Sequence, residues 1–580
     1  MHTILSELTP LLTKGKYADA AHLLQRHLSQ HPADHELWLK LATIAKQANL
    51  AELHHQAQTQ YQLVSYYNHR LYLADQALRQ RQLKECGALL NELLRDVPGE
   101  FRALALYAEL AIACGDYDAA TEIFETLNLH NYAHPQLHHR AVQHLAAAKQ
   151  FNKALLVSQQ IPLQQLIATP ETALAVAQSY VKTAKLEQAE QLYILLSQNQ
   201  RLKAFVTQRL GHLKAFIGDS DRAAAYYTDA LETEPENTES YWYLANLKTY
   251  SFNEQQIARM EQLQQTDLPL QHQIFLLFAL AKVKEQQHNW TEACRYYQQA
   301  NGLLHKPGQH HTLNDSLSLR DYFSRHPVAQ KAAGSSGLIF ILGLPRTGST
   351  LLEQMLASHP QIDASHEIPE ITSIARMLES RKTDSSPYGL ATLSEQQKCS
   401  LAQRYLDYVA PLRQQGRYLI DKLPANCNHI GLIKTLFPDA KIIEMTRDPI
   451  ATGWSLFRHL FAEGHLYANN LQDIGQYYLN YEQMMQFWRQ QLGTQLYSIS
   501  YEELLQAPET HLQRLMQYLE LEFHPGCMQF HQTARAIQTP STMQVRQPLY
   551  TSALTDWLQV SDFLEPLITK VQSGRANILS

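Results

Sequence analysis

The chain has 580 residues, of which 45% are hydrophobic and 18% are charged, and its formal net charge is −6 at pH 7. The length supports two or more domains, and the composition is that of a globular protein rather than a disordered or fibrous one. The mildly negative charge provides no general attraction to nucleic acid or to an anionic membrane.

The cysteines and histidines show no metal-site pattern. The six cysteines contain no Cys-x-x-Cys pair, and the clusters among the 28 histidines have no recurring partner at metal-ligand spacing. No stretch reaches the roughly 18 apolar residues of a transmembrane helix, and the first 16 residues lack the cationic start and apolar core of a signal peptide. We therefore expect a cytoplasmic protein without a metal site or membrane segment.

The first half of the chain repeats with a period near 34 residues. The unit markers are Tyr17, Leu83, Tyr117, Phe151, Leu186, Ser220 and Trp290. Three residues after each marker comes a small side chain, namely Ala20, Cys86, Ala120, Ala154, Ala189, Ala223 and Ala293. Proline follows some markers by 15 residues, where a helix should stop, at Pro32, Pro98 and Pro235. The pattern predicts a helical solenoid.

Units such as 115–124 and 218–227, which begin Gly-Asp and carry small and aromatic residues at fixed positions, resemble tetratricopeptide repeats. The resemblance covers about residues 1–305, or roughly nine units, with the regions near residues 49 and 252 degenerate. It implies stacked helix hairpins whose concave groove binds a protein or peptide partner. A rigid spacer or a dimerisation surface is the alternative.

A linker is expected over residues 306–336, where the repeat fades into a Gly/Ser-rich run. Beyond it, short apolar segments at 338–342, 417–421, 441–446 and 496–500 alternate with helical patterns. Such segments indicate a buried parallel sheet, and hence an α/β domain over residues 337–580. Ligands of these sheets bind at the carboxyl ends of the strands.

The first predicted strand runs into a glycine-bounded loop that opens a helix. Gly343 and Gly348 have the spacing of a P-loop, whose backbone N–H groups hold phosphate at a helix N-terminus. Ser349 stands where a nucleotide triphosphatase has its lysine, and Arg346 supplies a cation from inside the loop instead. We expect phosphate binding without ATP hydrolysis.

The other predicted strands also end in groups suited to an anionic nucleotide. Lys422 follows the second strand, Arg447 follows the third, and Tyr501 follows the fourth. Ser455 comes eight residues after Arg447, on the next predicted helix. Because the carboxyl ends of parallel strands meet at one edge, these groups should form one crevice.

Two of these segments resemble the cofactor motifs of sulfotransferases that use 3′-phosphoadenosine 5′-phosphosulfate (PAPS). The segment 345–350, Pro-Arg-Thr-Gly-Ser-Thr, resembles their 5′-phosphosulfate loop, and 447–455 resembles their 3′-phosphate motif. The similarity covers about residues 336–565 and is closest to tyrosylprotein sulfotransferases and their bacterial relatives fused to tetratricopeptide repeats. It implies an N-terminal all-α repeat solenoid and a C-terminal α/β P-loop-type sulfotransferase domain with a parallel sheet.

The resemblance implies catalytic roles for matching positions. Arg346 would bind and polarise the sulfonate, and Lys422 would stabilise charge on the bridging oxygen as the sulfonate leaves. Glu367 occupies the place of the catalytic base, with His366 beside it as the neighbour that orients the loop. Ser541 lies where a serine assists at the sulfonate.

The resemblance also implies a cofactor-binding set without metal. One position departs from the family, because Gln547 replaces a lysine that precedes a proline, and Arg546 is the candidate substitute. The expected PAPS-binding residues are Pro345, Arg346, Thr347, Gly348, Ser349, Thr350, Arg447, Ser455, Tyr501 and Arg546.

These features predict transfer of sulfonate from PAPS to an acceptor hydroxyl. Protein tyrosine is the favoured acceptor, while a glycan, lipid or small-molecule hydroxyl stays open because pocket walls choose the acceptor. Two other functions are weighed: a P-loop nucleotide kinase or ATPase, and a non-catalytic repeat scaffold with a relic sulfotransferase domain. The oligomeric state, and whether the repeats recruit substrate or regulate the enzyme, stay open.

Overall fold

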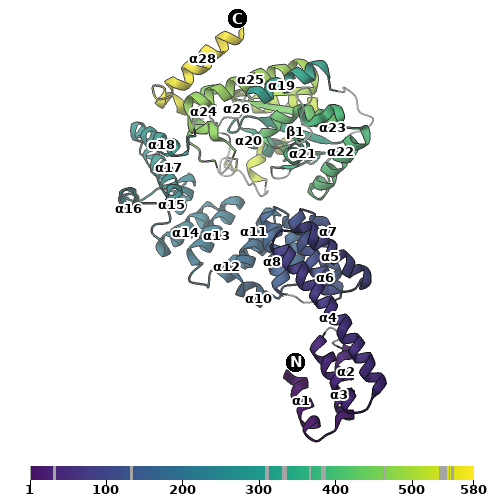
Figure 1. The fold of residues 1–580 in the computed structure, drawn as a ribbon. Coiled ribbons are helices and arrows are strands. Elements are labelled where there is room, and N and C mark those ends of the chain that lie inside the picture. Colours follow the sequence, from purple (N-terminus) through teal and green to yellow (C-terminus); the bar gives the residue numbers. More distant parts are fainter. Residues whose placement is uncertain are drawn as a thin grey trace. The chain divides into compact units, whose positions relative to one another are not determined.

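The computed structural model describes residues 2–30, 34–130, 135–247, 249–306, 313–328, 336–364, 367–379, 387–461, 464–533, 545–547, 549 and 554–579. Its residues group into two compact units, Met1–Leu196 and Ser197–Ser580. The boundary between the units falls within the helical part of the chain. The helices up to Leu196 belong to the first unit, and the later helices belong to the second unit together with the sheet (Figure 1).

The first unit is helical throughout its described residues. Its helices are α1 (His2–Thr13), α2 (Tyr17–Gln30), α3 (His35–Gln47), α4 (Ala51–Arg79), α5 (Leu83–Asp96), α6 (Phe101–Cys114), α7 (Tyr117–Leu129), α8 (Pro135–Ala147), α9 (Phe151–Ser158), α10 (Leu163–Ala168), α11 (Pro170–Lys182) and α12 (Leu186–Leu196). Most helices pack against the next one along the chain, as α3 does against α4 and α6 against α7, which is the nearest-neighbour packing expected of a repeat solenoid.

The repeat markers found in the sequence are structural boundaries. Each one is the first residue of a helix: α2, α5, α7, α9 and α12 in the first unit, and α14 and α18 in the second. The small residue three positions later is fully buried in every case. The prediction of a repeat solenoid is thus confirmed, and the small side chain lets two helices approach closely.

The degenerate region near residue 49 has a structural explanation. A single 29-residue helix, α4, occupies the place of two shorter helices. Elsewhere the hairpins turn on a left-handed residue, such as Gly115 (φ 80°) after α6 and Gly218 (φ 86°) after α13. Glycine adopts this backbone without steric cost, and that is the physical basis of the Gly-Asp unit start.

The second unit begins with the remaining repeat helices and continues into an α/β region. Its helices before the sheet are α13 (Lys203–Ile217), α14 (Ser220–Thr233), α15 (Thr238–Asn246), α16 (Glu254–Gln264), α17 (Leu270–Gln286), α18 (Trp290–Leu304) and α19 (Leu313–Arg325). Those that follow are α20 (Ser349–Leu356), α21 (Glu370–Glu379), α22 (Glu395–Val409), α23 (Ile430–Leu436), α24 (Pro449–Phe457), α25 (Leu471–Leu492), α26 (Tyr501–Gln506), α27 (Pro508–Leu519) and α28 (Glu565–Leu579).

One parallel sheet lies in this unit. Its strands are β1 (Leu338–Gly343), β2 (Ile362–Ala364), β3 (Tyr418–Lys422), β4 (Lys441–Thr446) and β5 (Leu496–Ser500), in the order β2-β3-β1-β4-β5. The register pairs Phe340 with Asp421 and with Ile442. The four strands expected from the sequence are present, whereas the three-residue β2 is too short to give an apolar run.

Helices cover both faces of the sheet because alternate strand residues point to opposite sides. On β1, Phe340 packs in a core with α21, α22, α23 and α25. Its neighbours Ile339 and Ile341 pack on the other face with α20, α26 and α27. The result is a three-layer α/β arrangement, in agreement with the predicted fold class.

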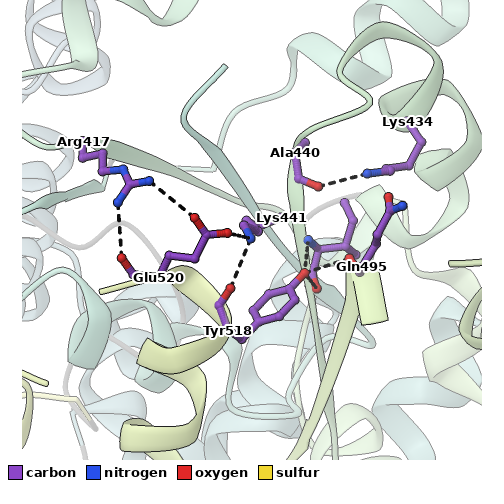
Figure 2. Close-up of polar contacts among 8 residues, drawn as sticks. Arg417, Lys434, Ala440, Lys441, Gln495, Tyr518 and Glu520 are labelled. Atoms are coloured by element: carbon purple, nitrogen blue, oxygen red, sulfur yellow. Dashed lines mark hydrogen bonds and ion pairs between the residues drawn. The ribbon is translucent and has the colours of Figure 1, made fainter. Parts of the chain in front are cut away.

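The amino-terminal edge of the sheet is tied to the end of α27 by ion pairs (Figure 2). Lys441 Nζ donates to Tyr518 O at 3.2 Å and lies 2.9 Å from Glu520 Oε1, while Arg417 Nη1 donates to Glu520 O at 3.2 Å. Both cations meet the carbonyl end of a helix, where the helix dipole favours positive charge. This edge is built for stability, and the opposite edge carries the groups suited to an anion.

A third core joins repeat helices to the α/β region. It combines Phe278 of α17 and Tyr297 of α18 with Trp454 and Phe457 of α24. It also includes Leu567 of α28. Trp454 and Phe457 are both buried in this core. The last repeats and the sheet region thus share one hydrophobic core.

Asp421 is a buried carboxyl in the middle of the sheet. It accepts hydrogen bonds from Tyr405 Oη at 2.7 Å and from Asn426 Nδ2 at 3.1 Å. Burial nevertheless raises the pKa of Asp421 to about 7, because the two donors and Lys422 offset only part of the lost hydration. The folded protein therefore binds this proton more tightly than the unfolded chain does.

We expect Asp421→Asn to change how stability depends on pH. The wild type should lose about 2.5 kcal/mol relative to the variant between pH 5 and 8, because a carboxyl with a raised pKa loses stability as pH rises toward that pKa. Urea unfolding of both proteins across this range measures the difference. The exposed Asp407 provides the control as Asp407→Asn, and a pH-independent difference for Asp421→Asn would refute the account.

Candidate functional site

The loop between β1 and α20 has a tightly constrained backbone. Arg346 (φ 70°) and Gly348 (φ 97°) both lie in the left-handed region, and Thr347 Oγ1 donates to Leu344 O at 2.8 Å. A Cβ on Gly348 would lie 2.4 Å from the ring of Tyr501, so only glycine fits. The loop ends at the N-terminus of α20, whose backbone N–H groups and dipole favour an anion.

The residues of this loop differ in their exposure. Thr347, Ser349 and Thr350 are buried, while Pro345 and Arg346 are half-buried. Burial of the hydroxyl residues at the first turn of α20 places their backbone amides in a water-poor environment, where an anion gains more from each hydrogen bond. This is the geometry expected of a phosphate-binding loop.

Three of the predicted cofactor residues meet at this loop from distant parts of the sequence. Arg346 Nε donates to Ser455 Oγ at 3.2 Å, and Arg447 Nη1 donates to Arg346 O at 3.1 Å. The Arg447 guanidinium also lies 4.9 Å from the ring centre of Tyr501. The loop, the end of β4, helix α24 and the start of α26 therefore meet at one edge of the sheet, as expected.

The charged form of Arg447 is less favourable at this position than in water. Burial lowers the pKa of Arg447, and Arg458 adds repulsion, while Tyr501, Glu502 and Asp448 offset part of the effect. Burial likewise raises the pKa of Tyr501. A partly desolvated guanidinium gains strongly from an anionic ligand, because little hydration is lost when the ligand binds.

Lys422 lies at the end of β3 and connects two carboxylates. Its Nζ is 2.7 Å from Glu367 Oε1 and 3.8 Å from Glu353 Oε2. Lys422 and Glu353 are each 2% exposed, whereas the Glu367 side chain is 40% exposed. Glu367 can thus reach a ligand from the solvent side while it contacts a buried cation.

The adjacent acidic residues serve other purposes. Asp421 accepts hydrogen bonds from Tyr405 and Asn426. Asp448 caps α24 by accepting from Ile450 N at 2.9 Å and Ala451 N at 2.8 Å, and helix capping of this kind is a common role of aspartate. Neither acid is therefore mainly an ion-pair partner of the cation next to it in the sequence, Lys422 or Arg447.

Glu353 is a site residue that sequence reasoning missed. It lies on α20, one turn beyond the loop, and on a helix an isolated glutamate is ordinarily a surface residue. Its burial beside Lys422 follows from the packing of α20 on the sheet. Its four-residue spacing from Ser349 was the one signal that it faces the same side as the loop.

Two further predicted residues are not described by the structure, and a third, Arg546, contacts a different helix. Ser541 and His366 lie outside the described residues. Arg546 Nη2 donates to Phe216 O at 3.5 Å, and its side chain packs over Gly218, so it lies against the end of α13.

Within the described part of the chain, no group of three or more His, Cys, Asp or Glu side chains is arranged to hold a metal ion. Over the same residues, no helix is both long enough and apolar enough to span a membrane.

Comparisons with known proteins agree with this arrangement. Residues 339–525 match the family model described as "Sulfotransferase family", and residues 77–145 match a model described as "Tetratricopeptide repeat". The sulfotransferase match contains the loop, Glu367, Lys422, Arg447, Ser455 and Tyr501.

Individual relatives are distant. An uncharacterized protein of Aquifex aeolicus is 27% identical over 64% of this chain, which spans 50% of that relative's length. Protein-tyrosine sulfotransferase 2 of Gallus gallus is 25% identical over 42% of this chain and 68% of its own. Human protein-tyrosine sulfotransferase 1 is 24% identical over 38% of this chain and 63% of its own.

Among solved structures, the sulfotransferase domain from the curacin biosynthetic pathway is 20% identical, with a TM-score of 0.31, over 42% of this chain and 97% of that domain. The family models agree with the two kinds of structure observed, the helical repeats and the parallel sheet. Residues 77–145 of the chain are thus similar to tetratricopeptide repeats, and residues 339–525 are similar to the sulfotransferase family.

Proposed function

We propose that the protein transfers the sulfonate of PAPS to an acceptor hydroxyl. The observation that carries this proposal is the contact set that joins Arg346, Ser455 and Arg447 at the loop before α20. A P-loop alone would suit any phosphate. A second anion-binding pair next to the loop suits a nucleotide that carries phosphate at both its 5′ and 3′ ends.

Each part of the site has a proposed binding task. The amides of residues 347–350 and the start of α20 would hold the 5′-phosphosulfate, with Pro345 shaping the loop. Arg447 and Ser455 would hold the 3′-phosphate, and Tyr501 would support the Arg447 guanidinium through its ring face. Ser455 Oγ accepts a hydrogen bond from Arg346, and that hydroxyl would turn toward the 3′-phosphate when Arg346 binds the sulfonate.

Lys422 and Glu367 would carry the chemical step. As the acceptor oxygen forms its bond to sulfur, the bond between sulfur and the bridging oxygen breaks, and negative charge develops on the phosphate that leaves. Arg346 and Lys422 would stabilise that charge electrostatically, as cations do in the related phosphoryl transfer. Glu367 would accept the proton of the acceptor hydroxyl, since it is the carboxylate of the pair that solvent reaches.

The remaining predicted residues keep their proposed roles in the C-terminal loop. Ser541 would assist at the sulfonate. Arg546 would supply the cation that a lysine provides in the tyrosylprotein sulfotransferase family, and in that role its guanidinium would leave Phe216 O at the end of α13. Protein tyrosine is the proposed acceptor because several relatives are named protein-tyrosine sulfotransferases. The repeats would bind the protein partner or substrate that presents it.

Binding of 3′-phosphoadenosine 5′-phosphate (PAP) tests the nucleotide site. PAP should stabilise the wild type against heat, and Arg447→Met should weaken its binding by roughly 10- to 100-fold, because a charge-assisted phosphate contact is lost. Arg417→Met removes the same charge at the opposite edge of the sheet and should leave PAP binding unchanged. Stabilisation by Mg-ATP but not by PAP would instead support a nucleotide kinase or ATPase.

Turnover of labelled PAPS tests the proposed base. Glu367→Gln should lower the rate of sulfonate transfer to acceptors in a cell lysate by roughly 10²- to 10⁴-fold, because the acceptor proton loses its base. PAP affinity should stay equal or rise, since the site becomes more positive. Glu395→Gln is the control, because that exposed carboxylate also lies 2.7 Å from a lysine, Lys398. Absence of any labelled acceptor in the wild type would favour the scaffold function.

A further inference from the structure

Helix α24 connects the nucleotide site to the repeats. Its first residue follows Arg447 and Asp448, and it carries Ser455 near its end. Its N-terminus is capped by Asp448, and Leu567 of α28 packs against Gly453, where an added Cβ would lie 2.3 Å away. The position of Ser455 thus also depends on the contacts at the C-terminal end of α24.

The C-terminal end of α24 is held by the last repeat hairpin, α17–α18. Asn301 Nδ2 donates to Phe457 O at 2.8 Å, which satisfies one of the carbonyls that a helix end leaves without an intrahelical partner. Tyr297 packs edge-on against Trp454 with ring centres 5.7 Å apart. Both contacts are buried and belong to the core shared by the repeats and the sheet region.

An ion network reinforces this junction. Glu285 of α17 accepts from Lys282 Nζ at 2.9 Å and lies 3.5 Å from Arg458 Nη1, while the other Arg458 nitrogen, Nη2, lies 3.5 Å from Asp556. Arg458 directly follows α24, and its side chain and those of Lys282 and Glu285 are less than one-fifth exposed. Partly buried pairs of this kind are sensitive to loss of one partner.

The charges of this network interact with the charges of the nucleotide site. Burial lowers the pKa of Lys282, Glu285 opposes that effect, and the charges of Arg458 and Arg346 add to it. Burial would raise the pKa of Glu285, but Lys282 and Arg458 hold it below its ordinary value. Arg458 also repels Arg447. Glu285 therefore offsets positive charge beside the loop while it ties α17 to α24.

We propose that Glu285 and Asn301, two repeat residues outside the sulfotransferase family match, are positioning residues of the 3′-phosphate site. They act through α24, which they hold so that Ser455 stays beside Arg346 and Arg447. The last repeat hairpin is then part of the nucleotide site's support. This inference rests on the proposed function, because it assumes that the site binds a 3′-phosphorylated nucleotide.

The test measures PAP affinity by calorimetry on the full chain. Glu285→Gln keeps the shape of the side chain and removes the charge that pairs with Arg458, while Asn301→Asp keeps the shape and removes the donor to Phe457 O. Each should weaken PAP binding about tenfold, a typical size for coupling between sites, because we expect the displacement of Ser455 by a loosened α24 to outweigh the more positive site that Glu285→Gln leaves. Glu285→Asp should recover part of the loss in the first variant.

The control lies on the neighbouring helix, α16. Glu261→Gln removes an ion pair with Lys284 of α17, where the two groups are 3.2 Å apart and the Glu261 side chain is 47% exposed. It should leave PAP affinity unchanged. Hydrogen exchange should be faster across residues 452–458 in Glu285→Gln but not in Glu261→Gln, because only the first variant loosens α24.

The outcomes separate the two proposals. If the wild type binds PAP, and Glu285→Gln and Asn301→Asp bind it with the same affinity as the wild type, the positioning role is overturned and the proposed function stands. Lower melting temperature with unchanged PAP affinity would show a merely structural role and overturn it as well. Failure of the wild type to bind PAP would overturn the proposed function together with this inference. If Glu285→Gln does not fold, Asn301→Asp decides.

Discussion

The site depends on holding several partly or fully buried cations close together at one edge of the sheet. Arg346, Arg447, Lys422 and Arg458 repel one another, and burial makes each charge more costly. The fold offsets this cost locally: carboxylates pair with Lys422 and Arg458, and a backbone carbonyl accepts from Arg447. An arrangement that is costly when empty and favourable with an anion present is what tight binding of a charged nucleotide requires.

The parallel sheet makes this arrangement possible. Because all strands run in one direction, the groups that follow β1, β3, β4 and β5 gather at one edge, and the other edge is left for stabilising contacts such as those of Arg417 and Lys441 with Glu520 (Figure 2). The last repeats add a further support to the same edge through α24. The proposed nucleotide site therefore draws on more of the chain than the part that matches the sulfotransferase family.

Much of this was predictable because the patterns involved are local. The 34-residue period gave the helix starts, and apolar runs gave four strands. The spacing from Arg447 to Ser455 correctly placed both beside the loop, since the β-strand and helix geometry between them is regular. Contacts that depend on tertiary packing were not predictable. They include the burial of Glu353, the pairing of Lys422 with two carboxylates, and the contact of Glu285 with Arg458. Each joins elements that are far apart in the sequence.

The boundary between repeats and α/β domain shows the same limit. Composition and repeat fading suggested a linker after residue 305, while the packing joins α17 and α18 to α24 in one core. A change in sequence pattern marks where repeats end, but side-chain contacts determine which elements form a cooperative unit. The repeats before Leu196 form a compact unit of their own.

The most direct test of the central claim is a crystal structure of the protein with PAP bound. The account predicts the 5′-phosphate over the amides of residues 347–350, and the 3′-phosphate within hydrogen-bond distance of Arg447 and Ser455. A nucleotide whose 3′-phosphate lies elsewhere, with Arg447 and Ser455 unchanged in their contacts, would contradict it.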